Sequence, residues 1–386
     1  MNTKQLDKEY IAASYGRFDV QFEKGEGSLL YDENGKRYID MGSGIAVNTF
    51  GLCDKAWQKA VAEQAATLQH VSNLYYTSPQ ARLAKMLCEK SGMKKVFFGN
   101  SGAEANECAI KCARKYSFDK YGEGRNVIIT LKNSFHGRTI TTLAATGQDV
   151  FHTTFGPFTE GFRYAEPNDI ESVKSLVDDK VCAIMMELVQ GEGGVIALDK
   201  DFVKAVEKLC HEKDILLVID EVQTGNGRCG KLYCYMNYGI TPDIVSTAKG
   251  LAGGLPMGAA LMGEKTKDTI TPSSHGSTFG GNPVCAAGAC SIIERIDDKL
   301  CEEVARKSKY IIDTLTGAKG IKSISGMGLM LGIETEKPAK DIVLACIEKG
   351  VVPLTAKTKV RLLPALNIPD ELLKEAVEVI KEVAAQ

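Results

Sequence analysis

The stretch Ile215-Leu216-Leu217-Val218-Ile219-Asp220 is an unbroken apolar run closed by a carboxylate. Similar apolar runs recur along the chain at 96–98, 127–131, 181–186, 244–246 and 259–262. Apolar residues at helical spacing lie between them, at about 103–120, 138–146 and 200–213. Continuous apolar strands separated by helices predict an α/β fold with a mostly parallel sheet covered on both faces.

The C-terminal part has a different pattern. One long helix is expected at about 283–315, followed by short strands around 328–333 and 351–363 and a final helix from about 370. Near the N-terminus, Asn34-Gly35 between short apolar pieces is a typical hairpin signal. The C-terminal pattern predicts a small α+β domain beside the large α/β one.

Composition excludes several classes of protein. The 386 residues include 47 basic and 49 acidic ones, and a net charge of −2 gives no basic surplus for a nucleic-acid partner. The twelve cysteines include no C-x-x-C pair, so no metal site is expected. Without a signal peptide or an apolar run near ~18 residues, no membrane association is expected, and the cysteines are those of a cytoplasmic protein.

Two residues at the ends of apolar runs indicate chemistry. A carboxylate that closes a buried strand needs a cation or a donor, and Asp220 could face a protonated pyridine nitrogen or, alternatively, be a helix cap or a solvated turn residue. Lys249 follows the run 244–248 and precedes a glycine-dense loop. Burial can lower the pKa of such an amine and free it to attack a carbonyl, although most lysines reach solvent instead.

A third stretch, Gly99-Asn100-Ser101-Gly102-Ala103-Glu104, joins a strand to a helix. Backbone N–H groups at such a helix start suit a phosphate, while Ser101 and Glu104 alone would make a capping box that needs no ligand. Together the three stretches offer a phosphate seat, an acid for a pyridinium and a lysine for a carbonyl. Pyridoxal phosphate requires that combination.

Motifs along nearly the whole chain resemble the class III, fold-type I pyridoxal-phosphate aminotransferases. Those motifs are Ser43-Gly44-Ile45-Ala46-Val47-Asn48, Ser72–Thr77, Asn100–Asn106, Ser134-Phe135-His136-Gly137-Arg138-Thr139, Gln190–Gly194, Asp220–Gly225, Thr247–Gly250 and Ser277–Pro283. The resemblance implies an N-terminal segment 1–50 that contributes to the small domain, a large cofactor domain 51–282, and the C-terminal small domain 283–386.

The resemblance also implies that pyridoxal 5'-phosphate is the cofactor. Its expected contacts are Lys249 as the covalent attachment and proton carrier, Asp220 at the pyridine nitrogen, Gln223 at the phenolic oxygen, Phe135 on the ring face, and Ser101 and Gly102 at the phosphate. Thr278 is expected to reach that phosphate from the neighbouring subunit. A homodimer with shared active sites follows from this.

For substrates, the resemblance implies that Arg138 and Arg361 bind carboxylates and that Ser277 lies beside the substrate. Glu192 is expected to pair with Arg361, masking it for one substrate and releasing it for 2-oxoglutarate. Ile45 stands where ornithine aminotransferases have a tyrosine near the substrate amine, which favours an acylated donor. The expected reaction moves the δ-amino group of N2-acetylornithine to 2-oxoglutarate, a step of arginine biosynthesis.

Two departures from the family pattern leave the acyl group open. Gly51-Leu52-Cys53-Asp54-Lys55 replaces the usual Gly-His-x-His-Pro, and Glu187-Leu188-Val189 replaces Glu-Pro-Ile. The alternatives are transfer from succinylornithine, N-succinyldiaminopimelate, ornithine or 4-aminobutyrate, an intramolecular aminomutase, and a non-catalytic regulator. Against the regulator, Lys249, Asp220 and Arg361 are all retained.

Overall fold

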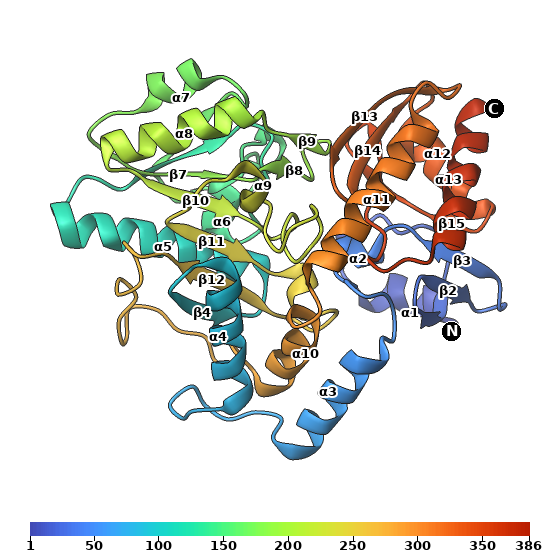
Figure 1. The fold of residues 1–386 in the computed structure, drawn as a ribbon, viewed down its shortest axis with the longest axis horizontal. Coiled ribbons are helices and arrows are strands. Elements are labelled where there is room, and N and C mark those ends of the chain that lie inside the picture. Colours follow the sequence, from blue (N-terminus) through green and yellow to red (C-terminus); the bar gives the residue numbers. More distant parts are fainter.

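A seven-stranded sheet forms the centre of the larger part of the molecule in the computed structural model, which describes all of residues 1–386 (Figure 1). In spatial order its strands are β4 (Lys95–Gly99), β12 (Gly258–Met262), β11 (Ile244–Thr247), β10 (Leu216–Asp220), β7 (Val181–Met186), β5 (Val127–Leu131) and β6 (Phe162–Ala165). Only β12 runs antiparallel to its two neighbours. The predicted mostly parallel sheet is confirmed. The edge strand β6 was not predicted, because its polar and aromatic residues form no apolar run.

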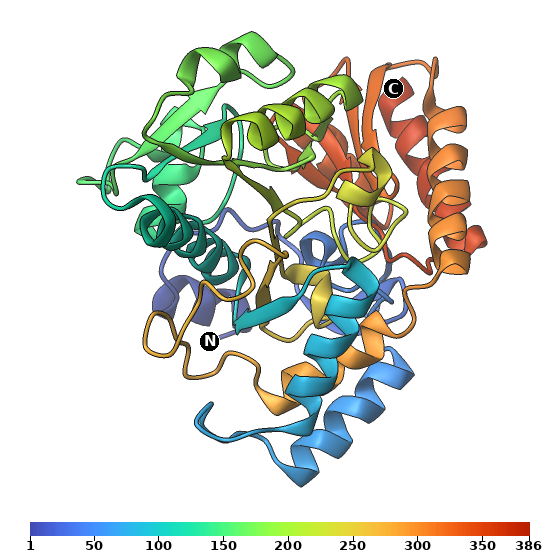
Figure 2. The same cartoon turned by 60° about the vertical axis from the view of Figure 1, so that its left-hand side comes forward.

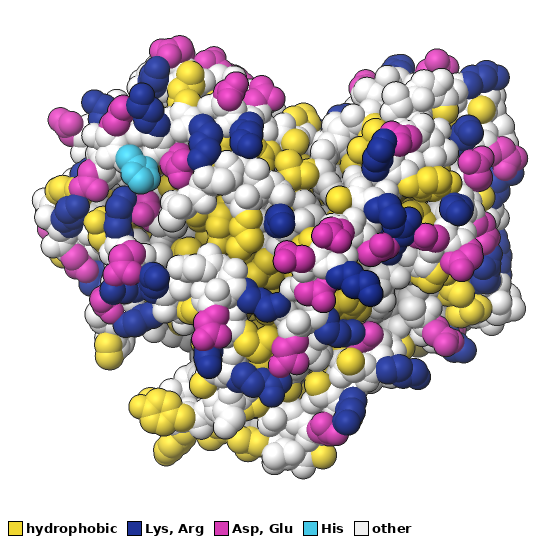
Figure 3. Space-filling model, in the orientation of Figure 1, with side chains coloured by type: hydrophobic (Ala, Val, Ile, Leu, Met, Phe, Trp, Pro, Cys, Tyr) yellow, Lys and Arg dark blue, Asp and Glu magenta, His cyan; other side chains and the backbone are white.

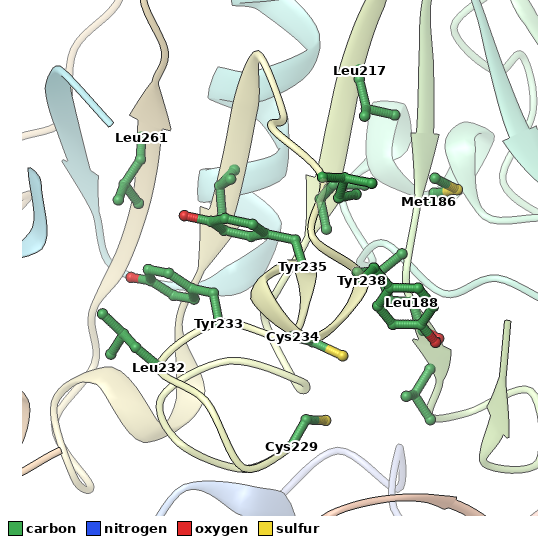
Figure 4. Packing of buried hydrophobic residues seen from close by; sticks show 14 of the residues in the cluster. Met186, Leu188, Leu217, Cys229, Leu232, Tyr233, Cys234, Tyr235, Tyr238 and Leu261 are labelled. Carbon is green, nitrogen blue, oxygen red and sulfur yellow. The ribbon is translucent and has the colours of Figure 1, made fainter. Parts of the chain in front are cut away.

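The two faces of the sheet follow from the alternation of side chains along each strand. On β10, Leu216 and Val218 pack with α5 (Gly102–Tyr121), while Leu217 and Ile219 join the core on the opposite face. That second core includes α8 (Lys200–Lys213) and α9 (Tyr235–Tyr238), and Figure 4 shows part of it, with the rings of Tyr233 and Tyr235 stacked 5.8 Å apart. The same alternation turns Asp220 towards α5.

The remaining elements of the larger part are helices and one small hairpin. They are α3 (Lys55–Thr67), α4 (Ser78–Ser91), α6 (Ile140–Ala145), the 3-10 turns Asp149–Phe151 and Lys249–Leu251, α7 (Ile170–Leu176), β8 (Val189–Gln190), β9 (Ile196–Ala197) and α10 (Pro283–Ile293). Cys182 and Cys210 are buried in this part and pack as small core residues. No helix of the chain combines the length and the apolar character needed to cross a bilayer.

The prediction of one long helix at 283–315 is wrong, because the chain breaks between α10 and α11 (Asp298–Leu315). Asp297 caps the second helix by accepting a hydrogen bond from the N–H of Leu300 at 2.8 Å. The two helices also pack differently: α10 lies against α3 and α4, and α11 against α13 (Asp370–Ala385) (Figures 1 and 2). Apolar spacing continues across the break, so the pattern alone could not reveal it.

Two four-stranded sheets build the smaller part. One contains β13 (Ile321–Met327), β14 (Met330–Thr335), β17 (Lys359–Leu362) and β16 (Leu354–Ala356), and the other β1 (Phe22–Glu26), β2 (Leu29–Asp32), β3 (Arg37–Asp40) and β15 (Val351–Val352). The Asn34-Gly35 hairpin is confirmed by the antiparallel pairing of β2 with β3. The helices of the smaller part are α1 (Thr3–Tyr10), α2 (Ser43–Ala46), α11, α12 (Ala339–Glu348) and α13.

Residues from both ends of the chain share one core in this smaller part. β3 pairs in parallel with β15, which places Ile39 opposite Val351. Tyr38, Ile39 and Met41 belong to the same buried cluster as Ile342 and Val343 of α12. The domain limits 1–50, 51–282 and 283–386 stay a prediction. The packing of α10 argues for a second boundary near residue 297 instead.

Candidate active site

A cavity of about 280 Å³ lies beyond the carboxyl ends of the central strands, where ligands bind in open α/β sheets. Its lining combines glycines, charged groups and one aromatic ring: Gly102, Ala103, Asn106, Phe135, His136, Gly137, Arg138, Glu187, Glu192, Asp220, Val222, Gln223 and Lys249. Seven of the residues selected from the sequence are in this set, so the fold brings together segments that are far apart in the chain.

Asp220 is 2% exposed and accepts three hydrogen bonds. Its Oδ2 accepts from Asn106 Nδ2 and from His136 Nδ1, both at 2.8 Å, and its Oδ1 accepts from the N–H of Val222 at 2.9 Å. Burial lowers the pKa of His136, but the hydrogen bond and charge of Asp220 outweigh it and raise that pKa above its usual value. Asp220 is therefore a held carboxylate and not a solvated turn residue.

Neither Asn106 nor His136 was predicted to bind Asp220, although both lie in quoted motifs. The signal was present in the alternation of β10, which turns Asp220 towards α5 and therefore towards Asn106. The contact from His136 depends on the loop after β5, whose course no local pattern predicts.

Lys249 has a strained backbone and an amine without a partner. Its φ of 45° is left-handed, a conformation that costs a non-glycine residue roughly 1–3 kcal/mol and is found at functional sites. Its Nζ makes no hydrogen bond or ion pair within the chain. Burial lowers the pKa of this amine in spite of the nearby Asp220 and Glu192 carboxylates. The side chain lines the cavity and does not reach for open solvent.

The start of α5 offers free donors to the cavity. Ser101 caps the helix, its Oγ accepting from the N–H of Glu104 at 3.2 Å, but Glu104 Oε2 takes the N–H of Asn100 at 2.6 Å. The N–H groups of Gly102 and Ala103 donate to no acceptor in the chain, and both residues line the cavity. A Cβ on Gly102 would lie 2.6 Å from Val222 Cγ1, so only glycine fits there. This arrangement suits a phosphate.

Arg361 reaches the site from β17 of the smaller part. It is 3% exposed, and its Nη1 donates to Glu192 Oε1 at 2.5 Å and to Gln223 Oε1 at 3.2 Å, while its Nε has no partner. Burial raises the pKa of Glu192, but the charge and hydrogen bond of Arg361 outweigh it and lower that pKa. A buried guanidinium with a spare donor can exchange its carboxylate partner for another.

Glu187 is a further cavity residue that the sequence did not single out for a role. Its Oε2 accepts from the N–H of Phe135 at 2.9 Å and its Oε1 from the N–H of Gly191 at 3.4 Å, so it fixes the segment that carries the aromatic ring. Burial raises its pKa to about 7, and the neighbouring His136 only partly offsets this. The signal in the sequence that could have indicated a role for Glu187 was a carboxyl group at the end of an otherwise apolar strand.

Four further selected residues are exposed or lie beside the cavity, and of these only Arg138 lines it. Arg138 is exposed, with its guanidinium carbon 5.5 Å from the Phe135 ring centroid. Ser277 Oγ accepts from Asn100 Nδ2 at 3.0 Å, next to the start of α5. Thr278 is exposed and Ile45 is 41% exposed, and neither lines the cavity of its own chain. Their predicted roles stay predictions.

The buried Glu221 provides a test of the electrostatics beside the site. Burial raises its pKa to about 7, although Thr224 Oγ1 and the N–H of Tyr235 donate to it. A carboxyl group whose pKa is raised in the folded state contributes its full stabilisation of the fold below its unfolded pKa of about 4.3. That contribution is lost as the pH rises through 7. Glu221→Gln, which cannot ionise, should therefore gain stability relative to the natural chain between pH 5 and 7, by up to ~1.4 kcal/mol per pH unit.

Denaturant unfolding of both proteins at pH 5, 6 and 7 measures this difference. A stability difference that stays constant across the three pH values would contradict the raised pKa of Glu221. The comparison is between two proteins at each pH, so titration of all other groups cancels.

Comparison with known proteins adds to the geometry. The family model described as aminotransferase class-III matches residues 10–384. The chain is 50% identical over 386 residues to the acetylornithine aminotransferase of Haemophilus ducreyi, covering 99% of this chain and 98% of that protein. It is 44% identical over 379 residues to the succinylornithine transaminase of Salmonella paratyphi A, covering 96% and 93%. A solved ornithine aminotransferase of Toxoplasma gondii, with partial occupancy of PLP at its active site, matches at a TM-score of 0.94 and 30% identity, covering 99% and 93%.

Proposed function

The chain belongs to the class III aminotransferases, and from this premise we propose that it transfers the δ-amino group of N2-acetylornithine to 2-oxoglutarate. The products are N-acetylglutamate 5-semialdehyde and glutamate. The observation that carries the proposal is the Arg361–Glu192 pair beside Lys249, because a masked cation lets one cavity accept first a donor and then a dicarboxylate. The acetylornithine aminotransferase of Haemophilus ducreyi supports the choice of donor.

The cavity residues fit pyridoxal phosphate, the cofactor of this family. Gly102 and Ala103 offer two free N–H donors for the phosphate, and the carboxylate of Asp220 would keep a pyridine nitrogen protonated. Phe135 supplies a ring to stack on, and Gln223 an amide for the phenolic oxygen. When bound, the cofactor supplies an electron sink for the carbon that gives up its proton.

The residues of the chain then divide the work. Lys249 would hold the cofactor covalently and, once the amine of the donor has taken its place, would be free to move the proton that the donor carbon loses. Its lowered pKa favours the neutral amine that can take up that proton. Asn106 and His136 keep the Asp220 carboxylate oriented throughout. After the first product leaves, Glu192 releases Arg361, and Arg361 binds the far carboxylate of 2-oxoglutarate.

A homodimer in the cytoplasm is part of the proposal, as is a place in arginine biosynthesis. Thr278 is exposed on its own chain, and the adjoining Phe279 is 60% exposed. Asn73 Nδ2 donates to the carbonyl oxygens of Ser277 and Gly280, which ties this loop to an exposed apolar segment between α3 and α4. Hydrophobic side chains project at the lower left of Figure 3, where Figure 1 shows that segment. A second copy covering this surface would receive Thr278.

A panel of amino donors tests the substrate. With saturating 2-oxoglutarate, kcat/KM should be at least ~10-fold higher for N2-acetylornithine than for free ornithine, because a pocket without a polar anchor does not compensate the extra charge of the free amine. N2-succinylornithine belongs in the same panel, since one relative is a succinylornithine transaminase. The matched variant Ile45→Tyr should shift the ratio towards free ornithine.

Equal rates with free and acetylated ornithine would contradict the assignment of the donor. Product formation without any 2-oxoglutarate would instead favour an intramolecular aminomutase. Both results are read from the same assay with the acceptor present or omitted.

A further inference from the structure

The segment 221–230, which follows β10, connects the separate parts of the site. Gln223 Oε1 accepts from Arg361, and Asn226 Nδ2 donates to the carbonyl of Ala248, next to Lys249, at 3.0 Å. The side chain of Arg228, in the same segment, extends away from the large sheet and into the smaller part of the molecule. The segment therefore holds both the lysine loop and the strand that carries Arg361.

Arg228 is 3% exposed and makes its bonds to main-chain carbonyls only. Its Nη1 donates to the carbonyl oxygens of Leu329, just before β14, at 3.1 Å, and of Pro364, just after β17, at 2.5 Å. The N–H of Leu329 donates back to the carbonyl of Arg228 at 3.0 Å. Strands β14 and β17 are neighbours, and in their register Arg361 lies opposite Gly332.

The cost of this arrangement argues that it has a purpose. No carboxylate lies within ion-pair distance of Arg228, and burial lowers its pKa to about 10, although the charge of the buried Asp40 acts in the opposite direction. A buried charge without an ionic partner is expensive, and an apolar side chain would fill the same space more cheaply. A guanidinium, however, holds several acceptors in a fixed plane, which an apolar side chain cannot do.

The contact also tolerates little movement. Gly328 has a φ of 58°, and a Cβ there would lie 2.4 Å from the carbonyl oxygen of Arg228. Gly227, with a φ of 87°, approaches Leu366 so closely that a Cβ would lie 2.7 Å from its Cδ1. The backbones on both sides of Arg228 are therefore packed directly on the smaller part, where β17 ends.

We propose that Arg228 is a positioning residue, which pins the carbonyl ends of β14 and β17 to the segment 221–230 and so sets where Arg361 meets Glu192, Gln223 and the acceptor carboxylate. The inference rests on the proposed function, in which Arg361 binds 2-oxoglutarate. Arg228 touches neither cofactor nor substrate. Its loss changes acceptor binding through the displacement of β17.

The experiment compares Arg228→Met and Arg228→Lys in the cofactor-loaded enzyme. For Arg228→Met, we expect the KM for 2-oxoglutarate and the Kd for glutarate, a dicarboxylate without the keto group, to rise ~10–100-fold, the range set by small misplacements. The KM for the amino donor should change less than ~3-fold, since the Arg228 side chain bonds to neither Lys249 nor Asp220. Arg228→Lys keeps a cationic donor, so its acceptor KM and glutarate Kd should lie between those of the natural chain and those of Arg228→Met. Calorimetry with glutarate gives a readout that does not depend on turnover.

Arg125→Met is the matched control. Arg125 also binds main-chain carbonyls, those of Val181, Lys213 and Asp214, but it lies at the amino ends of the strands, away from the cavity. The Arg125→Met variant should be less stable, but its KM values for the amino donor and for 2-oxoglutarate should not change by different factors. If Arg228→Met and Arg125→Met shift both KM values by the same factor, the positioning role is overturned.

Two further results keep the inference testable. If Arg228→Met does not fold, Arg228→Lys decides, and an unchanged acceptor KM and glutarate Kd in it overturn the inference. Arg361→Ala separates the inference from the proposed function: an unchanged acceptor KM there would remove Arg361 from the acceptor site altogether. If the acceptor KM rises in Arg361→Ala but not in the Arg228 variants, only the positioning role of Arg228 is contradicted.

Discussion

Lys249→Ala is expected to lower turnover by at least ~10⁴-fold, the range seen when a group that forms a covalent bond and moves a proton is removed. The lysine is the only amine that lines the cavity, and its Nζ has no partner that would hold it elsewhere. The variant should also lose the visible absorbance that covalent attachment of the cofactor produces. Borohydride reduction followed by peptide mass analysis should find the cofactor on the Lys249 peptide of the natural chain.

The matched control is Lys307→Met. Lys307 is a second buried lysine, 5% exposed, whose Nζ donates to the carbonyl of Leu366 at 3.0 Å and which does not line the cavity. That variant should be less stable but keep the absorbance and the covalent attachment. A cofactor that borohydride still fixes to Lys249→Ala would rule out Lys249 as the attachment site.

The second large effect is expected for Asp220→Asn, with kcat falling ~10²–10⁴-fold. The variant keeps the shape of the side chain but removes the charge that holds a proton on the pyridine nitrogen, and electrostatic groups at a reacting centre contribute on this scale. Asn106 and His136 would then face a neutral amide, so the pKa of His136 should fall, because the charge of Asp220 no longer opposes the lowering effect of burial. Single-turnover kinetics and NMR titration of the His136 ring measure the two effects.

Glu221→Gln is the control for this variant, because it neutralises the adjacent buried carboxylate. Glu221 binds Thr224 and the N–H of Tyr235 and does not line the cavity. Its turnover should stay within ~3-fold of the natural chain while its stability changes with pH. If both neutralised variants lost the same activity, the effect would belong to the packing of the segment and not to the charge of Asp220.

Much of the large sheet was predictable from the sequence because its strands are buried on both faces. The runs at 127–131 and 181–186 coincide with β5 and β7, since short continuous apolar runs are typical of strands buried on both faces. The edge strand β6 has Arg163 at its centre and carries no such signal. The break near Asp297 was missed because a capping aspartate within a helical pattern resembles any surface residue.

The candidate site divides in a similar way. Lys249, Asp220 and the start of α5 could be selected because each ends or follows an apolar strand, where the parallel fold gathers ligands. Glu187 and His136 were not assigned a role, since their importance arises from contacts across loops that no spacing records. The meeting of Arg361 with Glu192 joins residues 169 positions apart, and only the family resemblance indicated it.

The pairing of β3 with β15 also sets the order of events during synthesis. Ile39 leaves the ribosome early, but its partner Val351 is among the last residues to be made. All strands of the large sheet precede α10 in the chain, so they can pair while the first strands are still without their partner, as domains generally do on nascent chains. A chain that ends before residue 351 would therefore contain the strands of the large sheet but leave Tyr38 and Ile39 uncovered, a natural target for chaperones.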